Sequence, residues 1–204
     1  MDKIQEVRIV YVDDSPETDL SKFLSNYKSD KCILKHEDVV FNPQNGYESL
    51  LEKPVIQTAN IVLIDSKLFE NRNIVKGIFT GEEFKLILRK HFPFIEVIVV
   101  TQNDIEDGFL KLAKYNSKNN QRTASEYYKE VLPDILEEGI KRIIDYRKIA
   151  ANMRNNHSIE AVLVEKISNS LDGIGNYEDL SKSDIDEMVK LFKEVKEAVD
   201  SYGL

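Results

Sequence analysis

The sequence has a single cysteine, Cys32, so it cannot form an intramolecular disulfide. It has no apolar run close to the ~18 residues that a membrane-spanning helix needs. Its first residues, MDKIQEV, lack the apolar stretch of a secretory signal peptide. Together these absences predict a cytoplasmic protein with no membrane contact.

Dense runs of lysine and arginine are also missing, and the formal net charge is -8. Proteins hold a phosphate backbone through several cationic contacts, so we do not expect nucleic acid as a direct partner. Glycine and proline are sparse, at 8 and 5 of 204 residues, while 42% of the residues are hydrophobic. This composition is typical of a globular chain with a buried core rather than of a disordered one.

Short apolar segments alternate with amphipathic ones in the first half of the chain. The apolar segments are Val7–Val12, Ala59–Ile64 and Phe94–Val100. Such near-continuous runs favour strands that are covered on both faces. The amphipathic segments between them open on helix-start signals, Ser-Pro at Ser15 and Thr-x-x-Glu at Thr80. Residues 31–52 add a strand and a short helix, and the alternation predicts a doubly wound parallel sheet.

The second half is less regular. We place the fifth strand at Ser125–Val131, because its two tyrosines and a valine favour a pleated surface, and a helix that begins at Pro133. The prediction is therefore an α/β domain over residues 1–152 with a flavodoxin-like, five-stranded parallel sheet. Residues 153–204 are predicted to be a helical hairpin, with amphipathic helices over His157–Leu171 and Ser181–Tyr202.

Polar residues follow the predicted strands where each one ends. Asp13 and Asp14 follow the first, Asp65 follows the third and Thr101 follows the fourth. Because the carboxyl ends of parallel strands share one edge, these side chains should meet in the crevice where such folds bind ligands. Clustered carboxylates need a counter-charge, and oxygen ligands suit Mg²⁺. Asp65, which stands alone, is suited to attack a phosphoryl group.

These motifs resemble those of the response-regulator receiver domains of two-component signalling. The similar stretches are VDDSPE, NGYESL, VLID, GEEFKLILR and VIVVT, within residues 7–150. The resemblance implies a receiver fold, Mg²⁺ bound by Asp13, Asp14 and Asp65, and phosphorylation of Asp65 by a histidine kinase or phosphotransfer protein. Thr101 would then move towards the phosphoryl group. Any enzymatic activity would be limited to phosphorylation and dephosphorylation of the chain's own aspartate.

The family also carries a lysine at the end of its last strand, and two residues compete for that role. Lys118 has Tyr115 three residues before it, which is the family's usual spacing, but it lies in a poor strand. Lys129 lies in the predicted fifth strand, just ahead of the last helix. We predict Lys129 and leave Lys118 as the alternative.

Two departures from the family leave a second hypothesis open. Gln102 follows the switch threonine where the family has a small residue, and Lys67 lies two residues after Asp65. The chain could be a receiver-like interaction module that keeps the acidic pocket without phosphorylation control. A metal-dependent phosphohydrolase is disfavoured because the first strand ends in Asp-Asp, not Asp-x-Asp. Residues 153–204 are more acidic than basic, so output is expected through a downstream protein or a homodimer rather than DNA.

Overall fold

Five parallel strands form the centre of the protein. The computed structural model describes residues 5–68, 80–102, 110–118, 121–155 and 161–173. The strands are β1 (Glu6–Asp13), β2 (Ile33–Val40), β3 (Ile61–Asp65), β4 (Glu96–Thr101) and β5 (Lys111–Ala113). They pair in parallel in the order β2-β1-β3-β4-β5. This is the flavodoxin-like order, so the predicted α/β class and parallel sheet are confirmed.

Burial along the strands explains why the apolar segments form them. In β3 and β4 every residue is buried apart from the last residue of β3, as expected for central strands covered on both faces. Residues of β1 alternate between two cores: Val10 and Val12 lie in one, Ile9 and Tyr11 in the other. The edge strand β2 is largely exposed and keeps only Val39 buried.

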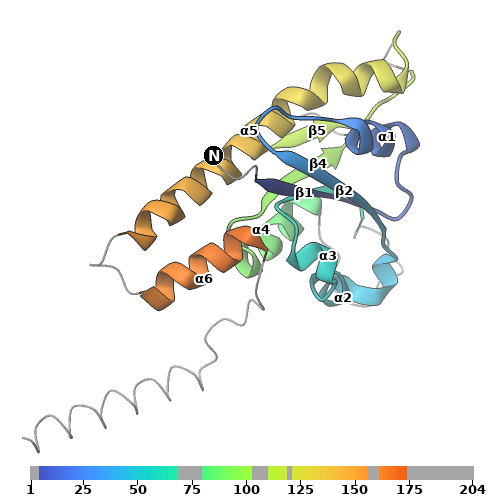
Figure 1. The fold of residues 1–204 in the computed structure, drawn as a ribbon. Helices are drawn as coiled ribbons and strands as arrows, with labels where there is room; N and C mark the ends of the chain where they lie inside the picture. Colours follow the sequence, from blue (N-terminus) through green and yellow to red (C-terminus); the bar gives the residue numbers. More distant parts are fainter. Residues whose placement is uncertain (1–4, 69–79, 103–109, 119–120, 156–160, 174–204) are drawn as a thin grey trace, which may run out of the picture.

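Two helical layers cover the sheet (Figure 1). Helices α1 (Thr18–Asn26) and α5 (Ala124–Arg154) lie on one face and share a core with Leu20, Leu132 and Ile140. The other face is covered by α2 (Gly46–Leu51), α3 (Pro54–Gln57) and α4 (Gly81–His91), and a 3-10 turn, η1 (Pro43–Asn45), leads into α2. The predicted capping box at Thr80 is confirmed, since its side chain accepts from the Glu83 amide.

The predicted fifth strand at Ser125–Val131 is wrong, because these residues lie in α5. Thr123 and Glu126 form a capping box that starts the helix there. Buried residues then recur at helical spacing: Tyr128, Leu132, Leu136, Ile140 and Ile143. Pro133 therefore lies inside a helix rather than at its start. The true fifth strand, Lys111–Ala113, comes earlier and is only three residues long.

Helix α6 (Ala161–Asp172) packs along α5, and its last residues lie at the amino edge of the sheet (Figure 1). Arg147 of α5 donates to the carbonyl oxygens of Glu6 (2.8 Å) and Leu171 (3.2 Å). Asn60 donates to the same Leu171 carbonyl at 3.1 Å. Gly173 follows with a φ of 66°, and a Cβ there would lie 2.7 Å from the Thr58 carbonyl oxygen. The end of α6 is thus held against the strand starts.

The first predicted helix of the hairpin corresponds to α6, while the second, Ser181–Tyr202, lies outside the described residues. The predicted boundary between residues 152 and 153 falls within α5, which continues to Arg154. Over the described part of the chain, no helix is both long and apolar enough to cross a membrane. The cytoplasmic location stays a prediction.

Candidate functional site at the carboxyl edge

The carboxyl edge of the sheet brings two predicted aspartates together with a lysine. Asp13 ends β1, Asp65 ends β3, and Lys114 directly follows β5. The Lys114 Nζ lies 3.1 Å from Asp13 Oδ2 and 3.3 Å from Asp65 Oδ1. The side chains of Lys114 and Asp65 are 19% and 15% exposed, so solvent screens this pairing only in part.

Asp13 is held through both of its carboxylate oxygens. The Tyr11 hydroxyl donates to Oδ2 at 2.6 Å, and the Ser15 amide donates to Oδ1 at 2.9 Å. Burial alone would raise the pKa of Asp13, but these hydrogen bonds and the Lys114 ammonium outweigh it, so the pKa lies below its usual value. Glu17, not either aspartate, is the N-cap residue of α1. The acidic pair is therefore not explained as a helix cap.

Asp14 and Asp65 complete the acidic cluster. Burial, the hydrogen bond with Asp13 and the charges of Asp13 and Asp65 all raise the pKa of Asp14. Asp65 accepts through Oδ2 from the backbone amide of Lys67 at 3.0 Å. The exposed Lys67 thus contacts Asp65 through its main chain. Among the described residues, three carboxylates lie near the single ammonium of Lys114, so negative charges outnumber positive ones in this cluster.

Lys114 is placed by the short pairing of β5 with β4. Its backbone amide donates to the Thr101 carbonyl oxygen at 2.6 Å. The pairing with β4 thus continues to Lys114, one residue past the end of β5. Burial would lower the pKa of the ammonium, but Asp65 and Asp13 raise it further than burial lowers it. The lysine therefore stays charged at neutral pH. Thr101 itself is 2% exposed and ends β4, as predicted.

Neither predicted lysine reaches the acidic cluster. Lys129 lies exposed on α5, and Lys118 lies exposed beyond β5, while Lys114 contacts the aspartates. The aromatic spacing that favoured Lys118 does not apply to Lys114, because the third residue before it is Lys111. The usable signal was the period-two alternation of Leu110 and Leu112, which ends at Lys114. Gln102, after Thr101, is exposed.

The cluster fits a hydrated divalent cation better than a bare one. In the described ranges, no three His, Cys, Asp or Glu side chains form a ready-made metal site. Mg²⁺ keeps several waters and needs only one or two carboxylates. Asp13, Asp14 and Asp65 would hold such an ion; desolvation and then the neighbouring carboxylates Asp13 and Asp65 raise the pKa of Asp14, and a bound cation would oppose both effects. Mg²⁺ binding stays a prediction.

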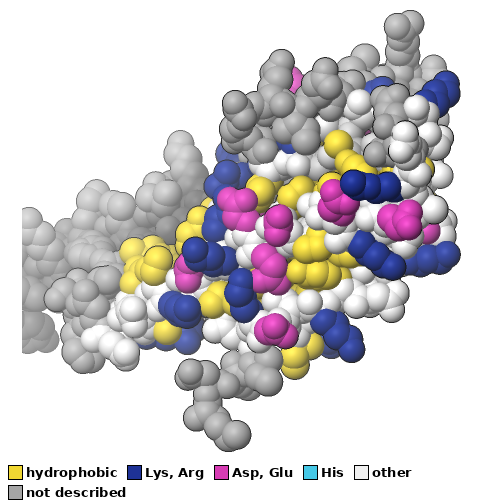
Figure 2. Space-filling model, turned by 90° about the horizontal axis from the view of Figure 1, so that it is seen from above, with side chains coloured by type: hydrophobic (Ala, Val, Ile, Leu, Met, Phe, Trp, Pro, Cys, Tyr) yellow, Lys and Arg dark blue, Asp and Glu magenta, His cyan; other side chains and the backbone are white. Residues whose placement is uncertain are grey.

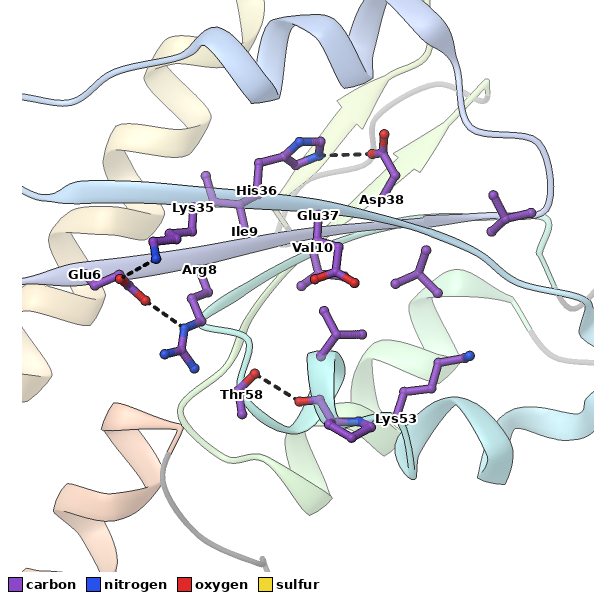
Figure 3. Close-up of a pocket in the computed structure, with 14 residues that line it drawn as sticks. Glu6, Arg8, Ile9, Val10, Lys35, His36, Glu37, Asp38, Lys53 and Thr58 are labelled. Atoms are coloured by element: carbon purple, nitrogen blue, oxygen red, sulfur yellow. Dashed lines mark hydrogen bonds and ion pairs between the residues drawn. The ribbon is translucent and has the colours of Figure 1, made fainter.

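Away from the carboxyl edge, a hollow of about 790 Å³ lies over β1 and β2 beside α3 (Figure 3). Arg8 and Lys35 both pair with Glu6 there, at 2.9 Å and 3.3 Å. His36 and Asp38 project from the opposite side of β2 and pair with each other at 3.0 Å. Because its two strand cations already share a carboxylate, this hollow is a weaker candidate than the carboxyl edge.

Comparisons of the chain with protein-family models, curated protein sequences and solved structures gave no match.

Proposed function

We propose that this chain is a receiver-like signalling protein in which Asp65 accepts a phosphoryl group, in a Mg²⁺-dependent reaction, from a histidine kinase or phosphotransfer protein. The observation that carries the proposal is the Lys114 ammonium between Asp13 and Asp65, at 3.1 Å and 3.3 Å. The cation lies beside a candidate nucleophile at the carboxyl ends of the strands. In sheets with this strand order, ligands bind at that edge.

Each residue has a distinct role in this proposal. A carboxylate oxygen of Asp65 attacks phosphorus, and the donor's leaving group departs with the bonding electrons. Lys114, released from Asp65, donates to a phosphoryl oxygen, and the Thr101 hydroxyl donates to another. Mg²⁺ held by Asp13, Asp14 and Asp65 would supply further positive charge to the phosphoryl oxygens. The Tyr11 and Ser15 hydrogen bonds keep Asp13 ionised and fixed.

We propose that the output is a protein contact. On the face turned upwards in Figure 1, the described residues place acidic and basic side chains among apolar ones, with no continuous region of one sign among them (Figure 2). Such a mixed face suits a protein partner better than a phosphate backbone, which favours clustered cations. The net charge of -8 favours the same choice.

Thermal unfolding with Mg²⁺ and beryllofluoride, which mimics an aspartyl phosphoryl group, tests the proposal. At about 100 times its dissociation constant the ligand should add about 2.7 kcal/mol to the free energy of unfolding. We expect this stabilisation in the wild type and in Asp134→Asn, an exposed control in α5, and its loss in Asp65→Asn. If the wild type does not respond although Asp65→Asn folds, the interaction module without phosphorylation becomes the better hypothesis.

A further inference from the structure

A ring of hydrogen bonds connects the acidic cluster with the start of α5. The Tyr11 hydroxyl donates to Asp13 at 2.6 Å and accepts from the Glu17 amide at 3.4 Å. The Tyr128 hydroxyl donates to Glu17 Oε2 at 2.6 Å and accepts from the Tyr115 amide at 3.1 Å. Tyr115 follows Lys114, whose ammonium returns to Asp13 and closes the ring.

The two tyrosine side chains have no room to move freely. Tyr11 and Tyr128 are both 0% exposed, and each hydroxyl is used once as a donor and once as an acceptor. A buried hydroxyl without partners costs free energy, so each of these hydroxyls holds its donor and its acceptor together. The Glu17 carboxylate accepts from the Tyr128 hydroxyl, and the Glu17 amide donates to the Tyr11 hydroxyl. Glu17 therefore joins the β1–α1 loop to α5.

Lys114 is held from both sides by this part of α5. The Tyr127 hydroxyl donates to the carbonyl oxygen of Ala113 at 2.9 Å, and Tyr128 binds the amide of Tyr115. The residues before and after Lys114 are therefore tied to consecutive tyrosines. Strand β5 contributes only three residues, so these side chains supply support that a longer strand would give.

We infer that Tyr11, Glu17 and Tyr128 are positioning residues that set where Lys114 stands relative to Asp13 and Asp65, and so control the rate of phosphoryl transfer to Asp65. The inference rests on the proposed function. Without the Glu17–Tyr128 contact, in the described part of the chain, the segment that carries Lys114 is joined directly to the end of β1 only through the Lys114 ammonium itself, and the ammonium is less often in reach of a phosphoryl oxygen. A misplaced group slows the chemical step more than it weakens donor binding.

The test is the kinetics of Asp65 phosphorylation by acetyl phosphate at saturating Mg²⁺. In this reaction the bond from phosphorus to the acetyl oxygen breaks and acetate leaves with the electron pair, so no other reactant is needed. We expect Tyr128→Phe to lower the maximal rate by about tenfold, the effect of one lost hydrogen bond to a charged group, with an unchanged half-saturating donor concentration.

Matched variants separate positioning from general stability. Tyr27→Phe removes a hydroxyl that directly follows α1 and donates to Glu137 of α5 at 3.1 Å. This variant should be phosphorylated at the wild-type rate. Glu17→Gln keeps an oxygen for the Tyr128 hydroxyl and should retain the rate, whereas Glu17→Ala should match Tyr128→Phe. All rates are compared below each variant's unfolding midpoint, measured by circular dichroism.

The outcomes distinguish the two proposals. An active wild type with Tyr128→Phe at the same maximal rate, or with Glu17→Gln as slow as Glu17→Ala, overturns the positioning role and leaves the proposed function intact. A rise in half-saturating donor concentration without a fall in maximal rate also overturns it. A wild type inert towards acetyl phosphate and beryllofluoride overturns both.

Discussion

A largely buried cation lies at each edge of the sheet in the described part of the chain, and the two have different sets of acceptors. At the amino edge Arg147, whose side chain is 11% exposed, donates to the main-chain carbonyls of Glu6 and Leu171 and pairs with a single carboxylate, that of Asp172, at 3.4 Å. At the carboxyl edge Lys114, 19% exposed, lies between the carboxylates of Asp13 and Asp65. The planar guanidinium can serve several fixed acceptors together, while the ammonium is a compact point charge.

The difference indicates which edge can change its occupant. If Arg147 is removed, the Glu6 carbonyl loses this donor and the Leu171 carbonyl keeps only Asn60 among the described donors, and no dissolved ion reproduces the planar arrangement. If Lys114 is removed, the carboxylates keep their negative charges, and the proposed Mg²⁺ would balance them. We therefore interpret the Arg147 contacts as a structural connection between the sheet and α6, and the Lys114 contacts as part of an exchangeable site.

The largest expected effect is at the amino edge. Arg147→Ala should lower the free energy of unfolding by about 2–4 kcal/mol, because it removes two hydrogen bonds from a charged donor, each worth roughly 1.5–3 kcal/mol, together with the Asp172 ion pair. Urea denaturation with and without Mg²⁺ measures the change, which Mg²⁺ should not restore. Arg154→Ala, an exposed change on the same helix, is the control and should stay within about 0.5 kcal/mol of the wild type. Restoration of Arg147→Ala by Mg²⁺ would contradict the comparison.

The intermediate effect is at the carboxyl edge. Lys114→Met should lower the free energy of unfolding by about 1–3 kcal/mol in Mg²⁺-free buffer, because Asp13, only 1% exposed, loses its counter-charge. Added Mg²⁺ should recover most of this loss. The matched control is Lys129→Met, which removes an exposed lysine and should have little effect. A loss in Lys114→Met that Mg²⁺ leaves unchanged would mean that this edge is as fixed as the other.

The sequence predicted the central part of this site but not its lysine, for physical reasons. Strands β1, β3 and β4 are buried on both faces, so their apolar runs are long and end visibly at Asp13, Asp65 and Thr101. Strand β5 has three residues and one fully buried side chain, Leu112, so its only signal is the alternation of Leu110 and Leu112, which is shorter than the apolar runs of the other strands. The pair Tyr127 and Tyr128 favours a strand by local propensity, but packing against the sheet selects a helix.

The amino edge could not be predicted from local sequence at all. Arg147 meets the Glu6 carbonyl across 141 positions of the chain, and Asn60 meets Leu171 across 111. Such contacts depend on where α6 lies after folding, and an arginine in an amphipathic helix gives no sign of them. The sequence therefore predicted the first helix of the hairpin, but not its contacts with Arg147 and Asn60.

The smallest expected effect tests whether the carboxyl edge carries excess negative charge. Partial desolvation raises the pKa of Asp14, and the carboxylates of Asp13 and Asp65 raise it further. Above that pKa the ionised form therefore destabilises the folded state. Asp14→Asn should therefore stabilise the Mg²⁺-free protein at pH 7, by less than about 1 kcal/mol because the side chain is exposed and screened. The gain should fade as the pH falls through the raised pKa and wild-type Asp14 takes up its proton. Urea denaturation from pH 4 to 7 measures this gain in stability, with Asp30→Asn as the exposed control. Lower stability of Asp14→Asn than of the wild type at pH 7 would show that Lys114 already balances the negative charge at this edge.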